Sequence, residues 1–351
     1  MPKTYNNLWD AIINFDNLYH AYKAARKGKR YRHESLEFLE DLEVNLIVLQ
    51  NELIWDMYRP KPFRQFYVFE PKKRLISAPA FIDRIVHNAL VKIMEKYFLQ
   101  KFVKETFACM VGRGTHAAMR HVLKCTRLAK RNWGKYYVLK CDIKKFFPSV
   151  DHNVLKRIVR RTICDKRTLN LIDIIIDSYE ADGKGIPIGS LTSQLFANVY
   201  LDPLDHFIKE ECKIKYYARY MDDFVIIHHD KKYLHRLKNE IENYITENLN
   251  LALNPKTAIF HERQGIDFCG YRVWPTHVLP RKSTIKRAKR RLRKMAAVYR
   301  SKPSIFRRAH DSIISFLGYV KHCSGKKSTN SILDSVVFLP PKRIPEEENI
   351  T

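Results

Sequence analysis

The central part of the sequence, between residues 135 and 280, alternates strand-like with helix-like patterns. A strand, a helical region, two short strands about a turn, a helix and a final strand follow one another, which is the order of a split βαβ sheet. This order predicts an α+β fold. The expected elements are a strand over 136–141, helices over 151–180 and 192–209 about a Gly/Pro-rich loop at 183–189, two strands within 216–227, a helix over 241–249 and a strand over 266–273.

The regions on either side of this centre are mainly helical. Apolar residues recur every three or four positions on both sides, which indicates amphipathic helices. Before the centre we expect helices over 7–27, 34–57 and 80–100, a strand over 63–70, and a helix capped by Thr115 that runs to about Leu128. After it we expect a helix capped by Ser283 or Thr284 that ends at Pro303, and a second that begins near Ile305 and stops near Gly325.

The chain is strongly basic, and the excess is concentrated near its end. Its 351 residues include 64 Lys and Arg against 37 Asp and Glu, a net charge of +27. Residues 281–330 hold sixteen of the basic residues and one acid, so this segment alone carries +15. Such an excess suggests a polyanionic partner, most simply nucleic acid.

Cysteine usage and hydropathy suggest where the protein works. The seven cysteines are dispersed, without a C-x-x-C pair, so neither a disulfide framework nor a zinc cluster is expected and small buried hydrophobes are the simplest interpretation. No apolar run is long enough to span a membrane, and the N-terminus has no apolar signal region. We expect a cytoplasmic protein with no membrane partner.

Three acids in the central region are candidates for chemistry. Asp142 follows an apolar strand, and Asp222 and Asp223 lie between two others. Neighbouring residues of a regular strand point to opposite faces, so the pair serves one site only if the backbone turns there. Two Mg²⁺ ions would neutralise three such carboxylates and suit in-line phosphoryl transfer. The alternative is structural: a hairpin tip for the Asp pair and a helix cap for Asp142.

Several motifs resemble those of one enzyme family, the reverse transcriptases. Tyr220-Met221-Asp222-Asp223 resembles their Y-x-D-D motif, and residues 141–147, Cys-Asp-Ile-Lys-Lys-Phe-Phe, resemble their first palm motif. Other segments match in the same order along the chain: 74–79 with Asp83 and Arg84, 112–116, 253–257 and 268–271. By motif the resemblance covers about residues 60–275.

The resemblance implies a right-hand polymerase that makes DNA on an RNA template. Its fingers would comprise residues 1–130, its palm with the catalytic site 131–278, and its basic helical thumb 279–351. The template RNA, the RNA–cDNA hybrid and dNTPs would be its partners. Two Mg²⁺ ions, which Mn²⁺ can replace, would be its cofactors.

A loop at 185–194 distinguishes between subfamilies of reverse transcriptases. Its sequence is Gly-Ile-Pro-Ile-Gly-Ser-Leu-Thr-Ser-Gln. Most bacterial and intron reverse transcriptases have Pro-Gln-Gly followed by Ser-Pro here, whereas Ile188 replaces the Gln and Gln194 replaces the second Pro. The pattern resembles the enzymes of diversity-generating retroelements, which act in bacteria and phage and misincorporate opposite template adenine. Three further segments fit those enzymes closely: 195–201, 218–223 and 274–277. The subfamily also implies a small basic accessory protein as a partner.

The resemblance implies a role for each matching residue. Asp142, Asp222, Asp223 and Lys256 would be catalytic, with Lys256 as a candidate general acid. The metal ligands would be Asp142, Ile143, Asp222 and Asp223. The dNTP site would consist of Arg74, Phe147 as the steric gate against a ribose 2′-OH, Ile188, Gly189 and Gln194. Phe268, Gly270 and Tyr271 would form the primer grip, and Lys286, Arg290 and Arg293 would contact the nucleic-acid backbone.

Most of these roles have a plainer alternative. Phe147 and Ile188 could be ordinary packing residues, Lys256 a solvated loop lysine, and Gln194 a helix cap. If Ile188 does face the nucleotide, the loss of an amide there would remove polar discrimination of the new base pair. For the whole chain, the alternatives are another prokaryotic reverse transcriptase, such as a retron, group II intron-like or phage-defence enzyme, and a catalytically dead RNA-binding scaffold.

Overall fold

The structure, a computed structural model, describes residues 3–69, 73–179, 182–299, 301–334 and 336–339. Its central sheet consists of β3 (Tyr137–Asp142), β4 (Tyr216–Tyr220), β5 (Asp223–His228) and β6 (Ala258–His261). Their order across the sheet is β4-β5-β3-β6, with every neighbouring pair antiparallel. This is the strand order of a split βαβ unit, so the predicted α+β fold is confirmed.

The last strand of that sheet was predicted at the wrong place. It is β6, whereas residues 266–273 form two strands of a separate small sheet, β7 (Ile266–Phe268) and β8 (Tyr271–Val273), which β9 (Val278–Pro280) completes. Cys269 and Gly270 both have positive φ, at 50° and 88°, and reverse the chain between β7 and β8. Two consecutive residues with positive φ are typical of the tight turns that match strand twist.

The N-terminal region contains shorter helices than the sequence pattern predicts. The expected helix over 7–27 is divided into α1 (Trp9–Ile13) and α2 (Phe15–Arg26), because the Asn14 side chain accepts hydrogen bonds from the backbone of Asp16 and Asn17 and starts a new helix. The expected helix over 34–57 is likewise divided at Asp41, into α3 (His33–Glu40) and α4 (Leu42–Ile54).

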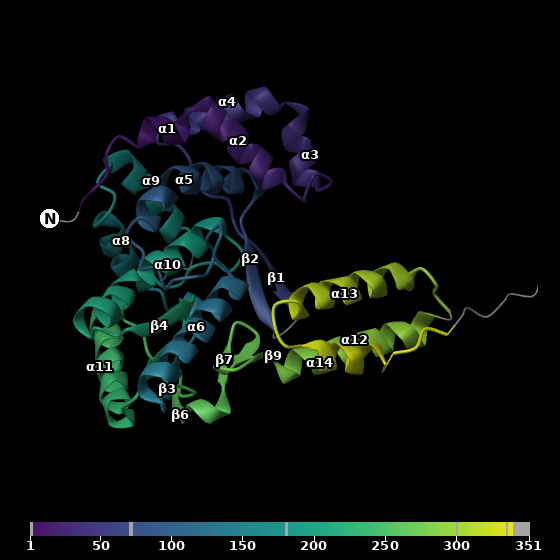
Figure 1. Cartoon of the computed structure of the whole chain (residues 1–351). Helices are drawn as coiled ribbons and strands as arrows, with labels where there is room; N and C mark the ends of the chain where they lie inside the picture. The colour runs from purple at the N-terminus through teal and green to yellow at the C-terminus, as the bar shows by residue number, and fades with distance from the viewer. Residues whose placement is uncertain (1–2, 70–72, 180–181, 300, 335, 340–351) are drawn as a thin grey trace, which may run out of the picture.

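A hairpin and two long helices connect this region to the central sheet. The hairpin is formed by β1 (Arg64–Val68) and β2 (Arg74–Ala78), and α5 (Phe81–Leu99) and α6 (Thr115–Trp133) follow it. Thr115 is the first residue of α6 rather than its cap, since Gly114 occupies the cap position. In Figure 1 the hairpin lies between the N-terminal helices and the C-terminal helices.

The predicted helix over 151–180 is also divided. A short α7 (Phe146–Ser149) precedes α8 (His152–Arg160) and α9 (Lys166–Asp177), and the carboxylates of Asp151 and Asp165 cap the last two. The helix α10 (Leu191–His206) continues as a π-helical turn over Phe207–Glu211, and α11 (Lys231–Leu249) is longer than expected. Asp230 caps α11, its carboxylate accepting hydrogen bonds from the backbone of Lys232 and Tyr233.

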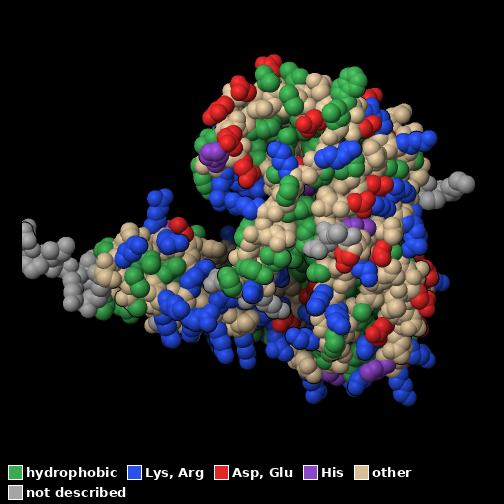
Figure 2. Space-filling model, turned by 180° about the vertical axis from the view of Figure 1, so that it is seen from behind, with side chains coloured by type: hydrophobic (Ala, Val, Ile, Leu, Met, Phe, Trp, Pro, Cys, Tyr) green, Lys and Arg blue, Asp and Glu red, His purple; other side chains and the backbone are tan. Residues whose placement is uncertain are grey.

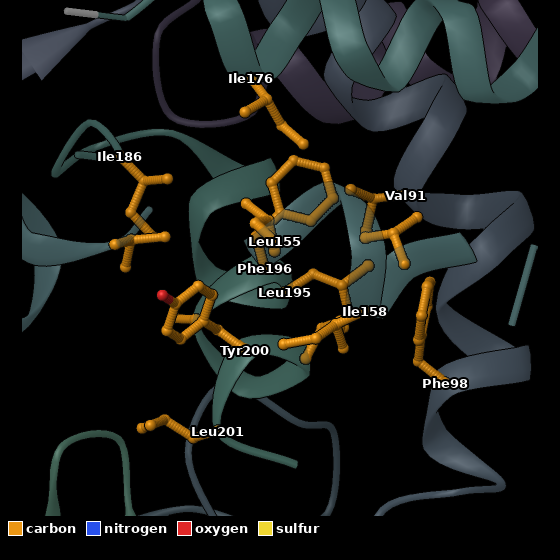
Figure 3. Packing of buried hydrophobic residues seen from close by; sticks show 14 of the residues in the cluster. Val91, Phe98, Leu155, Ile158, Ile176, Ile186, Leu195, Phe196, Tyr200 and Leu201 are labelled. Carbon is orange, nitrogen blue, oxygen red and sulfur yellow. The ribbon is translucent and has the colours of Figure 1, made fainter. Parts of the chain in front are cut away.

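The main hydrophobic core lies where α5, α8, α9 and α10 meet behind the central sheet. Figure 3 shows side chains from these helices converging, with Phe196, Leu195 and Tyr200 of α10 among those of the neighbouring helices. A second cluster packs α6 against the other face of the sheet, with Val138, Ala218 and Val225 as sheet members. The sheet is therefore covered on both faces.

The C-terminal helices form a unit with its own small core. These are α12 (Lys282–Tyr299), α13 (Ile305–Val320) and α14 (Lys326–Leu333), and they project from the rest of the molecule in Figure 1. Ala288, Leu292, Ala309 and Phe316 pack between them. The α12 helix begins at Lys282, before the predicted cap, and α14 was not predicted. Residues 340–351, the end of the predicted thumb, lie outside the described residues.

Two other expectations can be compared with the structure. All seven cysteines are free, as predicted, but only Cys125 and Cys141 are buried, while Cys109 and Cys164 are exposed. The expectation of small buried hydrophobes is therefore wrong for most of them. Among the described residues, no helix is long and apolar enough to cross a membrane.

Candidate active site

The three predicted carboxylates lie together at one edge of the central sheet. Asp142 ends β3 and is paired directly with Asp223, the first residue of β5. Asp222 lies in the turn between β4 and β5, where Met221 has a φ of 56°. The backbone carbonyl of Asp222 accepts a hydrogen bond from the Ile143 amide at 3.3 Å. The backbone turns at the Asp pair, as the sequence required for a shared site.

Burial and neighbouring charges affect the ionisation of Asp222 and Asp223. Burial raises the pKa of Asp222, and the Asp142 charge raises it further, while the positive charge of Arg74 lowers it. Burial likewise raises the pKa of Asp223, to about 6, with Lys140 opposing this effect and the other two acids adding to it. Neighbouring carboxylates of this kind are stabilised by a cation between them.

Lys140 is a member of the site that the sequence analysis missed. Its ammonium group lies 3.1 Å from Asp223 Oδ2 and also donates to the carbonyl of Asp267. Lys140 is two residues before Asp142, so both side chains belong to the same face of β3, and Asp223 is its diagonal neighbour on β5. This period-two spacing was the signal that could have identified it.

A buried ion pair supports the turn that carries Asp222. Arg219 and Asp205 are both fully buried, and the guanidinium donates to both carboxylate oxygens at 2.7 and 2.5 Å. Tyr217 and Thr106 donate to the same carboxylate at 2.6 and 2.7 Å. Arg219 also donates to the carbonyl of Met221 at 3.2 Å. The network therefore fixes the backbone of the turn at Met221. In the sequence, its sign is a single Arg between the aromatic residues of a strand.

Asn254 holds Asp142 in place through two hydrogen bonds. Its side-chain amide donates to Asp142 Oδ2 at 2.7 Å, and its backbone amide donates to the Asp142 carbonyl at 2.7 Å. The Asn254 side-chain oxygen accepts from the backbone of Lys256 at 3.1 Å. The Lys256 side chain itself is exposed. Asn254 thus orients the carboxylate, a role that the matching motif at 253–257 did not reveal.

Arg74 and Phe147 are the predicted nucleotide-contacting residues of β2 and α7. Arg74 is exposed at the start of β2, close enough for its charge to act on Asp222. Phe147 is half-buried in α7, with its ring 5.6 Å from that of buried Phe146. Its carbonyl accepts from the Ile186 amide at 2.9 Å, which joins α7 to the loop at 183–190. Both positions are compatible with nucleotide contacts.

The loop at 183–190 packs directly on the hairpin. The Ile188 carbonyl accepts from the Ser77 amide at 3.0 Å. Gly189 has a φ of 123°, and a Cβ there would lie 3.0 Å from Ile76 Cγ2. Close packing against β2 of the same molecule therefore requires a glycine at this position, a constraint that the sequence did not show. Ile188 is half-buried, and Gln194 is exposed on the first turn of α10, where Ser190 is the cap residue.

The residues of the predicted primer grip differ in their exposure. Phe268 and Tyr271 are fully buried, so their side chains support the turn between β7 and β8 rather than lie on its surface. Tyr319 of α13 donates to the Gly270 carbonyl, and the Tyr271 hydroxyl donates to the carbonyl of Tyr319 at 3.0 Å. The turn therefore connects the small sheet of β7, β8 and β9 to the C-terminal helices, and its half-exposed residues are Cys269 and Gly270.

The predicted backbone-contacting residues lie on one face of α12. Lys286, Arg290 and Arg293 are exposed and line a shallow depression. Figure 2 shows Lys and Arg side chains in a nearly continuous band along this helical unit and onto the adjoining body. Such a band matches the charge of a nucleic-acid backbone.

The donors at the sheet edge fit a divalent cation by their chemistry. The Asp142, Asp222 and Asp223 side chains and the Ile143 carbonyl offer the hard oxygens that Mg²⁺ prefers. Asp223 Oδ1 is buried without a hydrogen-bond partner, as expected of an oxygen that awaits a ligand. Among the described residues, no three His, Cys, Asp or Glu side chains lie close enough together in this structure to hold a metal ion between them.

A split βαβ sheet with acids at its edge, between a helical region and a basic helical arm, defines the class: a right-hand nucleic-acid polymerase. Comparison with known families agrees. Residues 61–273 match the family "Reverse transcriptase (RNA-dependent DNA polymerase)". The chain belongs to this family and is an RNA-directed DNA polymerase of the reverse transcriptase type, whose members generally use divalent metal ions.

Several curated proteins are similar to this chain. Protein YkfC of Escherichia coli (strain K12) is 28% identical over 275 residues, which cover 66% of this chain and 72% of YkfC. The group II intron-encoded protein LtrA of Lactococcus lactis is 22% identical over 350 residues, which cover 79% of this chain and 56% of LtrA. The chain thus spans about half the length of the intron-encoded relative.

Solved structures of telomerase also align with the chain. The enzyme from Candida albicans, in complex with a fragment of telomeric RNA, has a TM-score of 0.48 and 13% identity over 80% of this chain and 56% of its own. Apo telomerase from Candida tropicalis has a TM-score of 0.49 and 12% identity, over 80% of this chain and 63% of its own.

Proposed function

We propose that Asp142, Asp222 and Asp223 are the catalytic carboxylates and that they hold two Mg²⁺ ions, with the Ile143 carbonyl as a further ligand. The observation that carries this proposal is the direct pairing of Asp142 with Asp223 beside the Asp222 turn. The bound ions would activate the primer 3′-hydroxyl and stabilise the leaving pyrophosphate. Asn254 and Lys140 orient the carboxylates, and the Arg219–Asp205 pair holds the turn.

The nucleotide site follows from the surroundings of these acids. Arg74 would bind the triphosphate, because a guanidinium forks onto phosphate oxygens, and its charge already acts on Asp222. The half-buried Phe147 would stand against a ribose 2′-OH. Exposed Lys256, held near Asp142 through Asn254, would protonate the leaving group. Residues 1–130, 131–278 and 279–351 would act as fingers, palm and thumb.

Within the family, we propose the enzyme of a diversity-generating retroelement, which makes adenine-mutagenic cDNA from a template-repeat RNA. The supporting observation is the loop with Ile188, Gly189 and Gln194. Its contacts with Ser77 and Ile76 hold it between hairpin and palm. An aliphatic Ile188 offers no hydrogen bond to a base pair. A mispaired nucleotide would therefore lose less binding free energy, relative to a correct one, than it would beside an amide side chain. A small basic accessory protein would act with the enzyme.

Sequencing the cDNA made on a defined RNA template tests this proposal. Errors are expected mainly at template adenines, and Ile188→Gln is expected to reduce them. Leu191→Gln, an exposed position three residues further along, provides the control for an added amide. Equal error rates at all four template bases would reject the subtype while leaving the polymerase activity unaffected.

A second candidate is a group II intron-like or other prokaryotic reverse transcriptase. The similarity to LtrA over most of this chain favours it. This candidate predicts low error at every template base and no effect of Ile188→Gln at adenine. The same sequencing experiment therefore separates the two.

A further inference from the structure

The N-terminal helices α3 and α4 leave an unusual hydrophobic surface exposed. Val44, Val48 and Trp55 are exposed at 60%, 49% and 71%, and Ile47 and Ile54 lie beside them. Their spacing of three, four and seven positions places the first four in the chain on one face of α4, and Trp55 follows directly as the C-cap residue of the helix. We call these five residues the α4 ridge.

The opposite face of α4 is also hydrophobic and is fully used. Leu46, Leu49 and Leu53 are buried in the main core. A helix that is apolar on two opposite faces normally has both of them covered. Here the described part of the chain encloses only one face, so the α4 ridge is the side that lacks a partner.

The charge around the ridge is opposite to that of the molecule. Residues 33–57 contain seven acids and no Lys or Arg, in a chain of net charge +27. The acids are Glu34, Glu37, Glu40, Asp41, Glu43, Glu52 and Asp56. Figure 2 shows acidic side chains gathered with hydrophobic ones along the upper edge, over these helices, away from the basic band.

This charge restricts what can bind there. An RNA or DNA strand would be repelled, as would the surface of an anionic membrane. A second copy that met the same face would place acids against acids. A protein with basic residues around an apolar face is the complementary partner.

We propose that the α4 ridge is the docking site for a separate protein, which presents an apolar helix face bordered by Lys and Arg. A groove of about 560 Å³ lies beside the ridge, and its lining includes Glu34, Glu37 and Val48 as well as Lys61. These helices lie outside residues 61–273, which match the polymerase family. The proposal does not rest on the retroelement assignment.

Two synthetic amphipathic peptides can test the surface on the full-length protein. Both have the same Leu stripe on one helix face, flanked by Lys in one and by Glu in the other. Fluorescence anisotropy measures their binding at physiological salt. The net charge of +27 alone would favour the Glu-flanked peptide, whereas the ridge predicts tighter binding of the Lys-flanked peptide, by about tenfold or more.

Substitutions assign the binding to the ridge. The double variant Ile47→Ser/Val48→Ser is expected to bind the Lys-flanked peptide about tenfold or more weakly than the wild type. The double variant Glu43→Lys/Glu52→Lys is expected to bind the Glu-flanked peptide more tightly than the Lys-flanked one. Ile314→Ser, at an exposed position on α13, is the matched control and is expected to change nothing. Thermal melts and primer extension on RNA should remain as in the wild type for all variants.

Three results would overturn the proposal. The first is equal or tighter binding of the Glu-flanked peptide, or no binding of the Lys-flanked one. The second is unchanged affinity in Ile47→Ser/Val48→Ser. The third is concentration-dependent self-association of the wild type that this double variant abolishes, since it would assign the ridge to a second copy.

Discussion

Asp142 lies directly opposite Asp223 where β3 pairs with β5, at the last residue pair of the sheet before the Asp222 turn. The negative charge of Asp142 adds to the effect of burial in raising the pKa of Asp223, and a cation between the two carboxylates would offset it. We therefore expect the affinity of this site for metal ions to depend on pH.

Metal binding is expected to weaken as the pH falls through about 6. The pKa of Asp223 is raised to about 6, so this carboxylate is ionised above that pH and protonated below it. Protons then compete with the metal. Titration with Mn²⁺, followed by electron paramagnetic resonance, should show the loss in the wild type, with Asp10→Asn on exposed α1 behaving identically. Affinity that is constant between about pH 5 and 7.5 would contradict this prediction.

Removal of Lys140 is expected to shift the pH profile of polymerisation. Lys140 lowers the pKa of Asp223, so Lys140→Met should raise that pKa, and the acid limb of the rate profile should move to higher pH. Lys232→Met, at an exposed position on α11, is the control. A uniform loss of rate without a shift would show that Lys140 acts only through packing.

The buried ion pair behind the site is expected to be costly to break. Arg219→Met would leave Asp205 as an unpaired buried charge, which typically costs about 3–5 kcal/mol of folding free energy. Arg160→Met, which removes the partly exposed pair with Asp173, should cost no more than about 1 kcal/mol. Urea denaturation measures both variants. Similar losses in the two would contradict the special role of the Arg219–Asp205 pair.

The contact between the 183–190 loop and the hairpin is expected to depend on Gly189. An alanine there would crowd Ile76 and strain a φ of 123°, so Gly189→Ala should destabilise the protein by about 1–3 kcal/mol. Gly318→Ala on α13 meets open space and should be stabilising by about 0.5–1 kcal/mol. Thermal melts compare them, and a stabilising Gly189→Ala would contradict the packing described.

Local chemistry explains how far the sequence could predict this structure. The Asp222 turn was predictable, because an adjacent pair of acids between two short strands leaves few arrangements, whereas the edge strand β6 was missed and residues 266–273 were assigned in its place. The divided helices were not predictable, since the caps at Asn14 and Asp165 start new helices within apolar patterns that continue across them. A pattern in residue types does not show which side chain will cap.

The site was predicted in part for a similar reason. The acids stand out in an apolar strand and a turn, whereas Asn254 and Lys140 act through contacts between segments far apart in the sequence. The burial of Phe268 and Tyr271 depends on α6 and α13, which a local motif does not contain. Tertiary contacts therefore decide which motif residues face a ligand and which support it.

Primer extension on an RNA template by Asp222→Asn tests the central assignment most directly. The substitution keeps the size of the side chain and removes the charge, with Asp177→Asn, an exposed carboxylate on α9, as the control. We expect Asp222→Asn to fold normally and to lose activity by about a thousandfold or more, because charge stabilisation at such a site contributes several kcal/mol. Wild-type rates of dNTP incorporation by a folded Asp222→Asn protein would contradict the account.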